Sequence, residues 1–103
     1  MDLKDIETRE IMPGLHGKIV HGENITWAFW KAEKDTQVPL HQHENEQIMH
    51  VLDGEIELTL MGKTKIYRSG SVVIIPSNEP HSAVALTKCE LMDVFSPVRE
   101  DYR

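Results

Sequence analysis

The residues with the clearest chemical potential begin at His41 and His43, within residues 38 to 54. The two histidines are separated by one residue, so in an extended strand their imidazoles point to the same face. Gln47 follows four residues later, and His81 lies far downstream, after a strongly apolar segment. Together they would give a metal ion four protein ligands, with positions left for water or substrate. This spacing indicates a small metal-dependent β-barrel enzyme.

All four of these candidate ligands are neutral, so they leave the full charge on a divalent ion. Such a site is a stronger Lewis acid than one containing a glutamate, and it attracts a carboxylate or an enediol oxygen. Imidazole and amide donors suit zinc, nickel, iron, manganese or cobalt, so the sequence does not identify the metal. The remaining histidines have no comparable partners and are predicted to be surface or packing residues: His16, His21 and His50.

A candidate acid/base group lies near the end of the chain. Asp93 and Phe95 are two residues apart in a predicted strand, so both can face the barrel interior together with Leu91. An inward aspartate would be desolvated, which raises the pKa of its carboxyl and suits a proton shuttle. The alternative is a solvated strand-end carboxylate, or one paired with Arg99. Arg99 could lie over the barrel mouth and bind a carboxylate in bidentate fashion, or could belong to a solvated tail.

Short strands separated by turns must position these groups. Residues 55–61 alternate apolar and charged side chains, as a half-buried antiparallel strand does, whereas residues 71–76 are apolar on both faces and are predicted to be a central strand. No stretch has a helical period of useful length, so the pattern favours a β-sandwich or barrel. We predict an N-terminal arm or edge segment over residues 1–15 and one barrel domain over residues 16–103. The other predicted strands are residues 16–21, 25–32, the metal-site segment after residue 36, 48–52, 64–68, 81–86 and 90–95.

Length and composition narrow the class of protein. The chain has 103 residues, enough for one domain, and a formal net charge of −6, which disfavours nucleic acid as a partner. No apolar run approaches the roughly 18 residues of a membrane helix, and the N-terminus is too acidic for a signal peptide, so we expect a cytoplasmic protein. Cys89 is the single cysteine, which excludes an internal disulfide and suits a small buried strand residue.

The strand at residues 25–32 is apolar on both of its faces. Trp27 and Phe29 share one face, while Ala28 and Trp30 share the other. A barrel that also packs against a second subunit explains this pattern, so we predict a homodimer.

The spacing of these residues resembles the first motif of the cupin superfamily. That motif runs from a glycine through His-x-His to a glutamate and a second glycine. His41, His43, Gln47 and Gly54 hold its spacing, with Asp35 in place of the first glycine and glutamine in place of the glutamate.

The second cupin motif is also recognisable. Gly70, Pro76 and His81 match it, with Asn78 in place of a glycine and Ala85 in place of an asparagine. Asparagine tolerates positive φ better than most residues, so the loop at Asn78 is expected to turn. The resemblance covers nearly the whole chain from about residue 16, and implies an all-β fold: a cupin double-stranded β-helix, or jelly-roll barrel, in one small domain.

One branch of the superfamily is more similar than the others. Gln47, residues 51–55, residues 75–83 and the ending at residues 93–102 resemble the pectin-degradation cupins of the KdgF type. The resemblance implies action on 4,5-unsaturated monouronates from pectin or alginate, which are converted to the linear keto form. A small anionic sugar acid would then be the substrate.

The same resemblance implies roles for individual residues. Asp93 would be the acid/base group and Phe95 a wall that shapes the substrate site, with Arg99 as a clamp for the uronate carboxylate. Two other classes stay open: a non-catalytic metal-cupin that binds a sugar acid, and another small-molecule cupin enzyme such as an iron-dependent dioxygenase or a lyase.

Overall fold

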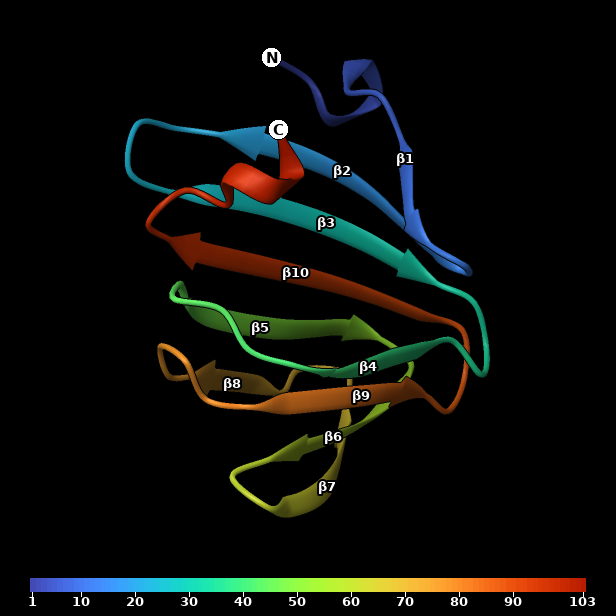
Figure 1. Cartoon of the computed structure of the whole chain (residues 1–103). Helices are drawn as coiled ribbons and strands as arrows, with labels where there is room; N and C mark the ends of the chain where they lie inside the picture. Colours follow the sequence, from blue (N-terminus) through green and yellow to red (C-terminus); the bar gives the residue numbers. More distant parts are fainter.

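The computed structural model describes residues 1–103 and contains ten strands and two short 3-10 turns, with no α-helix (Figure 1). The chain contains no helix that is long and apolar enough to cross a membrane. In chain order the elements are η1 (Leu3–Asp5), β1 (Arg9–Met12), β2 (Leu15–His21), β3 (Thr26–Ala32), β4 (Gln37–His41), β5 (Glu46–Asp53), β6 (Glu55–Leu60), β7 (Lys63–Arg68), β8 (Val72–Ile75), β9 (His81–Ala85), β10 (Cys89–Ser96) and η2 (Glu100–Tyr102).

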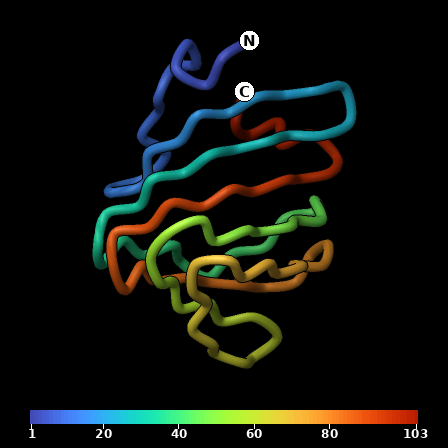
Figure 2. The backbone as a smooth tube through the Cα atoms, turned by 180° about the vertical axis from the view of Figure 1, so that it is seen from behind, coloured from blue at the N-terminus to red at the C-terminus, as the bar shows by residue number.

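The strands form two antiparallel sheets. The larger has the order β1-β2-β3-β10-β5-β8, and the smaller has the order β4-β9-β6-β7. The last strand, β10, therefore lies between β3 and β5, as both views of the chain show (Figures 1 and 2). The prediction of a single small all-β domain is confirmed. The boundary predicted at residue 15 stays a prediction, and β1 within the predicted arm pairs with β2 at the edge of the larger sheet.

Strict alternation along β10 determines what it contributes to the interior. Cys89, Leu91, Asp93 and Phe95 are all buried, while the residues between them are more exposed. Successive side chains of a strand point to opposite faces, so these four share the inner face of the larger sheet. Asp93 thereby enters an apolar core, beside Met49 on the neighbouring strand.

The prediction that residues 71–76 form a central strand was wrong. The segment forms β8, which pairs only with β5 and lies at the edge of the larger sheet. Val72 and Ile74 on its outer face are 62% and 60% exposed. Side chains point above and below a sheet, whereas neighbouring strands lie beside it. Apolar residues on both faces of a strand therefore do not indicate how many strands flank it.

Two turns that the cupin motifs build from glycine are built here from other residues. Asn78 has φ 61° and Asp35 has φ 71°, both in the left-handed region that these side chains tolerate better than most. The expectation that the Asn78 loop turns is confirmed. The Asn78 backbone N–H donates to the carbonyl of His43 at 2.8 Å, so this turn ties the loop before β9 to the loop after β4.

Candidate active site

Three histidines from two distant parts of the chain meet inside the barrel. His41 ends β4, His43 follows in the loop, and His81 begins β9, where it pairs with His41 across the strands. One potential ligand atom from each ring lies within 4.8 Å of the others. Because β4 ends at His41, only His41 lies on a strand, and the loop that follows places His43 beside it. The structure thus assembles a possible three-histidine metal site.

Each imidazole is held in one tautomer by a backbone carbonyl two residues away. A carbonyl can only accept a hydrogen bond, so the Nδ1 it contacts must carry the proton, which leaves Nε2 as a free lone pair. These contacts join Nδ1 of His41, His43 and His81 to the carbonyl oxygens of Pro39, Asn45 and Glu79, at 2.8, 2.9 and 2.8 Å. Nε2 of His43 is buried and has no hydrogen-bond partner. An unsatisfied buried lone pair is costly, and a metal ion would satisfy it, so the donor set fits a divalent cation.

Burial also keeps two of these rings neutral. The pKa of His81 is lowered to about 4, chiefly by desolvation, with the neighbouring imidazoles and Arg99 acting in the same direction and the Glu79 hydrogen bond opposing them. The pKa of His43 is lowered chiefly by burial and next by Arg99. At neutral pH both rings therefore present a lone pair without first losing a proton.

Gln47, the fourth predicted ligand, lies on the inner face of β5 and is 7% exposed. It lines the same pocket as His41 and His81. It is close enough to His43 and Asp93 to influence the pKa of each, yet neither Nε2 of His43 nor Oδ1 of Asp93 gains a well-aligned hydrogen bond. Its coordination of a metal stays a prediction.

Asp93 is buried at the wall of this pocket. Its Oδ2 accepts a hydrogen bond from Nε1 of Trp30 at 2.9 Å, while Oδ1 has no partner. Burial raises the pKa of the Asp93 carboxyl to about 6, although Gln47, Trp30 and Arg99 each act to lower it. The alternative of a solvated strand-end carboxylate does not fit a side chain that is 7% exposed.

Arg99 is packed against the barrel, in contrast to a solvated tail. It is 6% exposed, with its guanidinium 4.8 Å from the centre of the Phe95 ring and 4.1 Å from that of Tyr102. Its Nε and Nη2 donate to the two carboxylate oxygens of Asp101 at 2.9 and 2.7 Å. The bidentate edge predicted to bind a substrate carboxylate therefore already holds a carboxylate of the chain itself.

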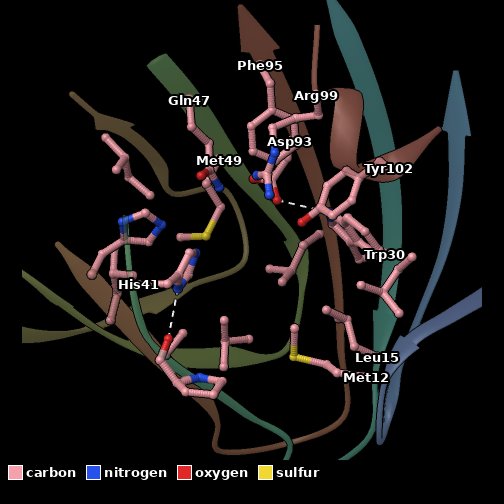
Figure 3. A pocket seen from close by; sticks show the side chains of 18 of the residues that line it. Met12, Leu15, Trp30, His41, Gln47, Met49, Asp93, Phe95, Arg99 and Tyr102 are labelled. Carbon is pink, nitrogen blue, oxygen red and sulfur yellow. Dashed lines mark hydrogen bonds between the residues drawn. The ribbon is translucent and has the colours of Figure 1, made fainter. Parts of the chain in front are cut away.

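The pocket that these residues share has a volume of about 650 Å³ (Figure 3). His41 lies on one side of it, and Asp93, Phe95, Arg99 and Tyr102 gather on the other. Much of the remaining wall is apolar, and Arg9 and Met12 from β1 add to it. The structure thus brings His41, His81, Gln47, Asp93, Phe95 and Arg99 to one cavity, with His43 adjoining His41 and His81.

Several residues that support the site were missed by reasoning from the sequence. Thr26 Oγ1 accepts from the Arg99 backbone N–H at 2.9 Å, and the Asn45 side chain donates to the carbonyl oxygens of Pro97 and Val98. These contacts anchor the C-terminal segment that carries Arg99. Asparagine and threonine are common in loops and strands, so nothing in their spacing marked them.

Trp30 and Tyr102 were also missed as site residues. Trp30 was predicted chiefly as part of an apolar strand face, and Tyr102 was given no role of its own. The two rings meet edge-on, with centroids 5.7 Å apart. A buried indole N–H needs a hydrogen-bond acceptor, and an aspartate was predicted to face the same interior. Together these two facts were the available signal for Trp30.

Comparison with known proteins identifies the class. Residues 28–95 match the cupin domain family, and the chain belongs to that family. It is distantly related to the pectin degradation protein KdgF of Dickeya dadantii (strain 3937), with 34% identity over 64 residues. That alignment covers 60% of this chain and 58% of the Dickeya protein, less than two thirds of its length.

Solved structures agree with this placement. An RmlC-like cupin from Shewanella frigidimarina NCIMB 400 superimposes with a TM-score of 0.95 and 26% identity, covering 100% of this chain and 94% of the other. KdgF from Halomonas sp. superimposes with a TM-score of 0.90 and 29% identity, covering 97% and 94%. The resemblance to cupins, and to their KdgF branch at a distance, is confirmed.

Proposed function

We propose that this cupin is a metal-dependent enzyme that promotes ring opening and ketonisation of 4,5-unsaturated monouronates from pectin or alginate breakdown. The observation that carries the proposal is the buried Asp93, with its raised pKa, in one pocket with the histidine cluster. The similarity to two KdgF proteins, one of them a pectin degradation protein, supports the choice of a sugar acid.

A divalent ion would be held by His41, His43 and His81, with Gln47 as the fourth ligand. When bound by these neutral donors it would supply Lewis acidity that polarises a substrate oxygen. The Nδ1 contacts hold the three rings in the tautomer that such binding requires, before any ion arrives.

The reaction rearranges bonds without gain or loss of atoms. The anomeric hydroxyl loses its proton and the bond between C1 and the ring oxygen breaks, which leaves an aldehyde at C1 and an enol at C5. The enol hydroxyl then gives up its proton while C4 accepts one, and the C5 ketone forms. A carboxyl with a pKa of about 6 can take and return protons near neutral pH, so we assign these transfers to Asp93.

Arg99 and Phe95 would orient the substrate. Nε and Nη2 of Arg99 are engaged by Asp101, so the guanidinium is fixed in place and Nη1 is the group left to contact a uronate carboxylate. Phe95 is 2% exposed and lines the pocket with its ring centre 4.8 Å from the Arg99 guanidinium, where it limits how a sugar ring can sit. Holding the substrate in one orientation is itself a large contribution to rate.

The direct test is an assay with 4,5-unsaturated galacturonate and protein of known metal content. We expect the absorbance of the conjugated alkene to disappear faster than it does spontaneously, and chelation of the metal to abolish the acceleration. Fully metallated protein that gives no acceleration would contradict the proposed function and leave the cupin fold as the only conclusion.

A homodimer through the outer face of the larger sheet is also proposed. The strand register aligns one apolar residue from each of five neighbouring strands in a continuous row across this face. Val72 of β8 lies on the same face, in the row beside it. The row consists of Val20, Trp27, Val94, Ile48 and Ile74. Ile48 is 43% exposed and Ile74 is 60% exposed, although both are apolar. A second copy packed on this face would remove that surface from water.

Ile74→Glu tests the dimer by placing a charge on the most exposed residue of the apolar row that forms the proposed contact. We expect the parent to sediment as a dimer and the variant to dissociate at least ~100-fold more readily, because an unpaired carboxylate would be buried in both copies. Ile66→Glu is the matched control, since Ile66 is 45% exposed on β7 of the other sheet. A parent that sediments as a monomer at equilibrium rules the dimer out.

A further inference from the structure

Trp30 lies on the inner face of β3 and is 2% exposed. Its backbone position pairs with Leu91 of β10 on one side and with Gly17 of β2 on the other. From there the indole reaches Asp93, and Nε1 donates to Oδ2 at 2.9 Å (Figure 3). The hydrogen bond joins a side chain of the pocket wall to the candidate acid/base group.

This contact makes the two oxygens of Asp93 different. Oδ2 is held by the indole N–H, whereas Oδ1 is buried without a partner, and the side chain lines the pocket. We infer that Trp30 is a positioning residue that holds Oδ2 of Asp93 and so fixes the orientation in which the carboxyl group exchanges protons with the substrate. The inference deepens the proposed function and rests on it.

The indole is itself fixed by its surroundings. A Cβ added at Gly17 would lie 2.2 Å from Cζ3 and 2.3 Å from Cε3 of Trp30, so the ring packs directly on the glycine. Gly17 has no positive φ, so space for the indole is what requires a glycine here. Tyr102 meets the indole edge-on, with ring centroids 5.7 Å apart and planes at 75°. A carboxylate held by such a ring has little freedom to rotate.

A tryptophan that merely fills the core would show the same burial. The two roles differ in what the indole N–H does: a packing role needs the ring, whereas a positioning role needs the N–H. Trp30→Phe separates them, because phenylalanine keeps an aromatic ring between Gly17 and Tyr102 and removes the donor. Trp27→Phe is the matched control, since Trp27 lies on the same strand with its side chain on the outer face.

The first experiment measures the contact itself, and needs no substrate. The chain has two tryptophans, so its nitrogen-proton NMR spectrum has two indole signals, which Trp30→Phe and Trp27→Phe assign. We expect Asp93→Asn to move the Trp30 signal, because a neutral amide is a weaker acceptor than a carboxylate, and to leave the Trp27 signal in place. A Trp30 signal that Asp93→Asn does not move overturns the inference.

The second experiment measures turnover of 4,5-unsaturated galacturonate. We expect Trp30→Phe to lower kcat about tenfold with KM and metal content close to those of the parent, and Trp27→Phe to change neither constant. Gly17→Ala, which keeps Trp30 but displaces its ring, should lower kcat in the same direction and shift the Trp30 signal. Equal kcat values for Trp30→Phe and the parent would overturn the positioning role. A parent without turnover contradicts the proposed function instead, and the NMR result still decides the contact.

Discussion

Asp93→Asn is expected to lower turnover of a 4,5-unsaturated uronate by at least ~100-fold, which is the usual size of a general acid/base contribution. Asparagine is nearly isosteric and can still accept from Trp30, but it cannot take or give a proton at neutral pH. The pKa of the Asp93 carboxyl, raised to about 6 by burial, is what suits the native residue to both transfers. The measurement is kcat on protein matched for metal content, which should not change.

Asp53→Asn provides the matched control. Asp53 is exposed at the end of β5, away from the pocket residues, so the same chemical change there should leave kcat unaltered. Equal activity of Asp93→Asn and the parent would remove Asp93 from the mechanism.

The same variant distinguishes an enzyme from a binding protein. A cupin that only binds a sugar acid would be stabilised by the ligand without turning it over, and Asp93→Asn would retain most of that stabilisation. An enzyme in which Asp93 transfers protons would retain binding as well, but the parent would show turnover that the variant lacks. Thermal unfolding with and without ligand, measured beside the rate, separates the two classes.

His43→Ala is expected to abolish both metal retention and turnover. The His43 ring places a buried Nε2 without a hydrogen-bond partner beside the other two imidazoles, so alanine removes one of three preorganised donors. A metal that binds the folded state stabilises it by RT ln(1 + [L]/Kd), about 4 kcal/mol at a thousand times Kd. That stabilisation should be present in the parent and absent in the variant.

Metal content after dialysis and the metal-dependent shift in Tm measure this effect without recourse to activity. His16→Ala is the control, because His16 lies outside the cluster and contacts Glu10 and Glu33 at the surface. The control should retain the parent's metal and Tm shift. Parent-like metal content and affinity in His43→Ala would show that the three-histidine cluster is not the metal site.

Local pattern was sufficient for much of the fold. Alternation in residues 55–61 predicted β6, and Asn78 predicted the turn before β9, whereas β5 and β6 on either side of Gly54 lie in different sheets. These features depend on each residue and its near neighbours, because a strand's period and a turn's φ values are local properties. The inward orientation of Asp93 follows from the same period of two.

The sequence by itself therefore determined the strand segments, the faces of their side chains and the residue types able to bind a metal or move a proton. Only the tertiary structure decided that β8 is an edge strand, that Trp30 holds Asp93, and that Arg99 is buried and pairs with the exposed Asp101. Each of these depends on which strands become neighbours and in what register. That choice is made by packing between segments far apart in the chain. The periodicity of a single segment carries no information about such packing.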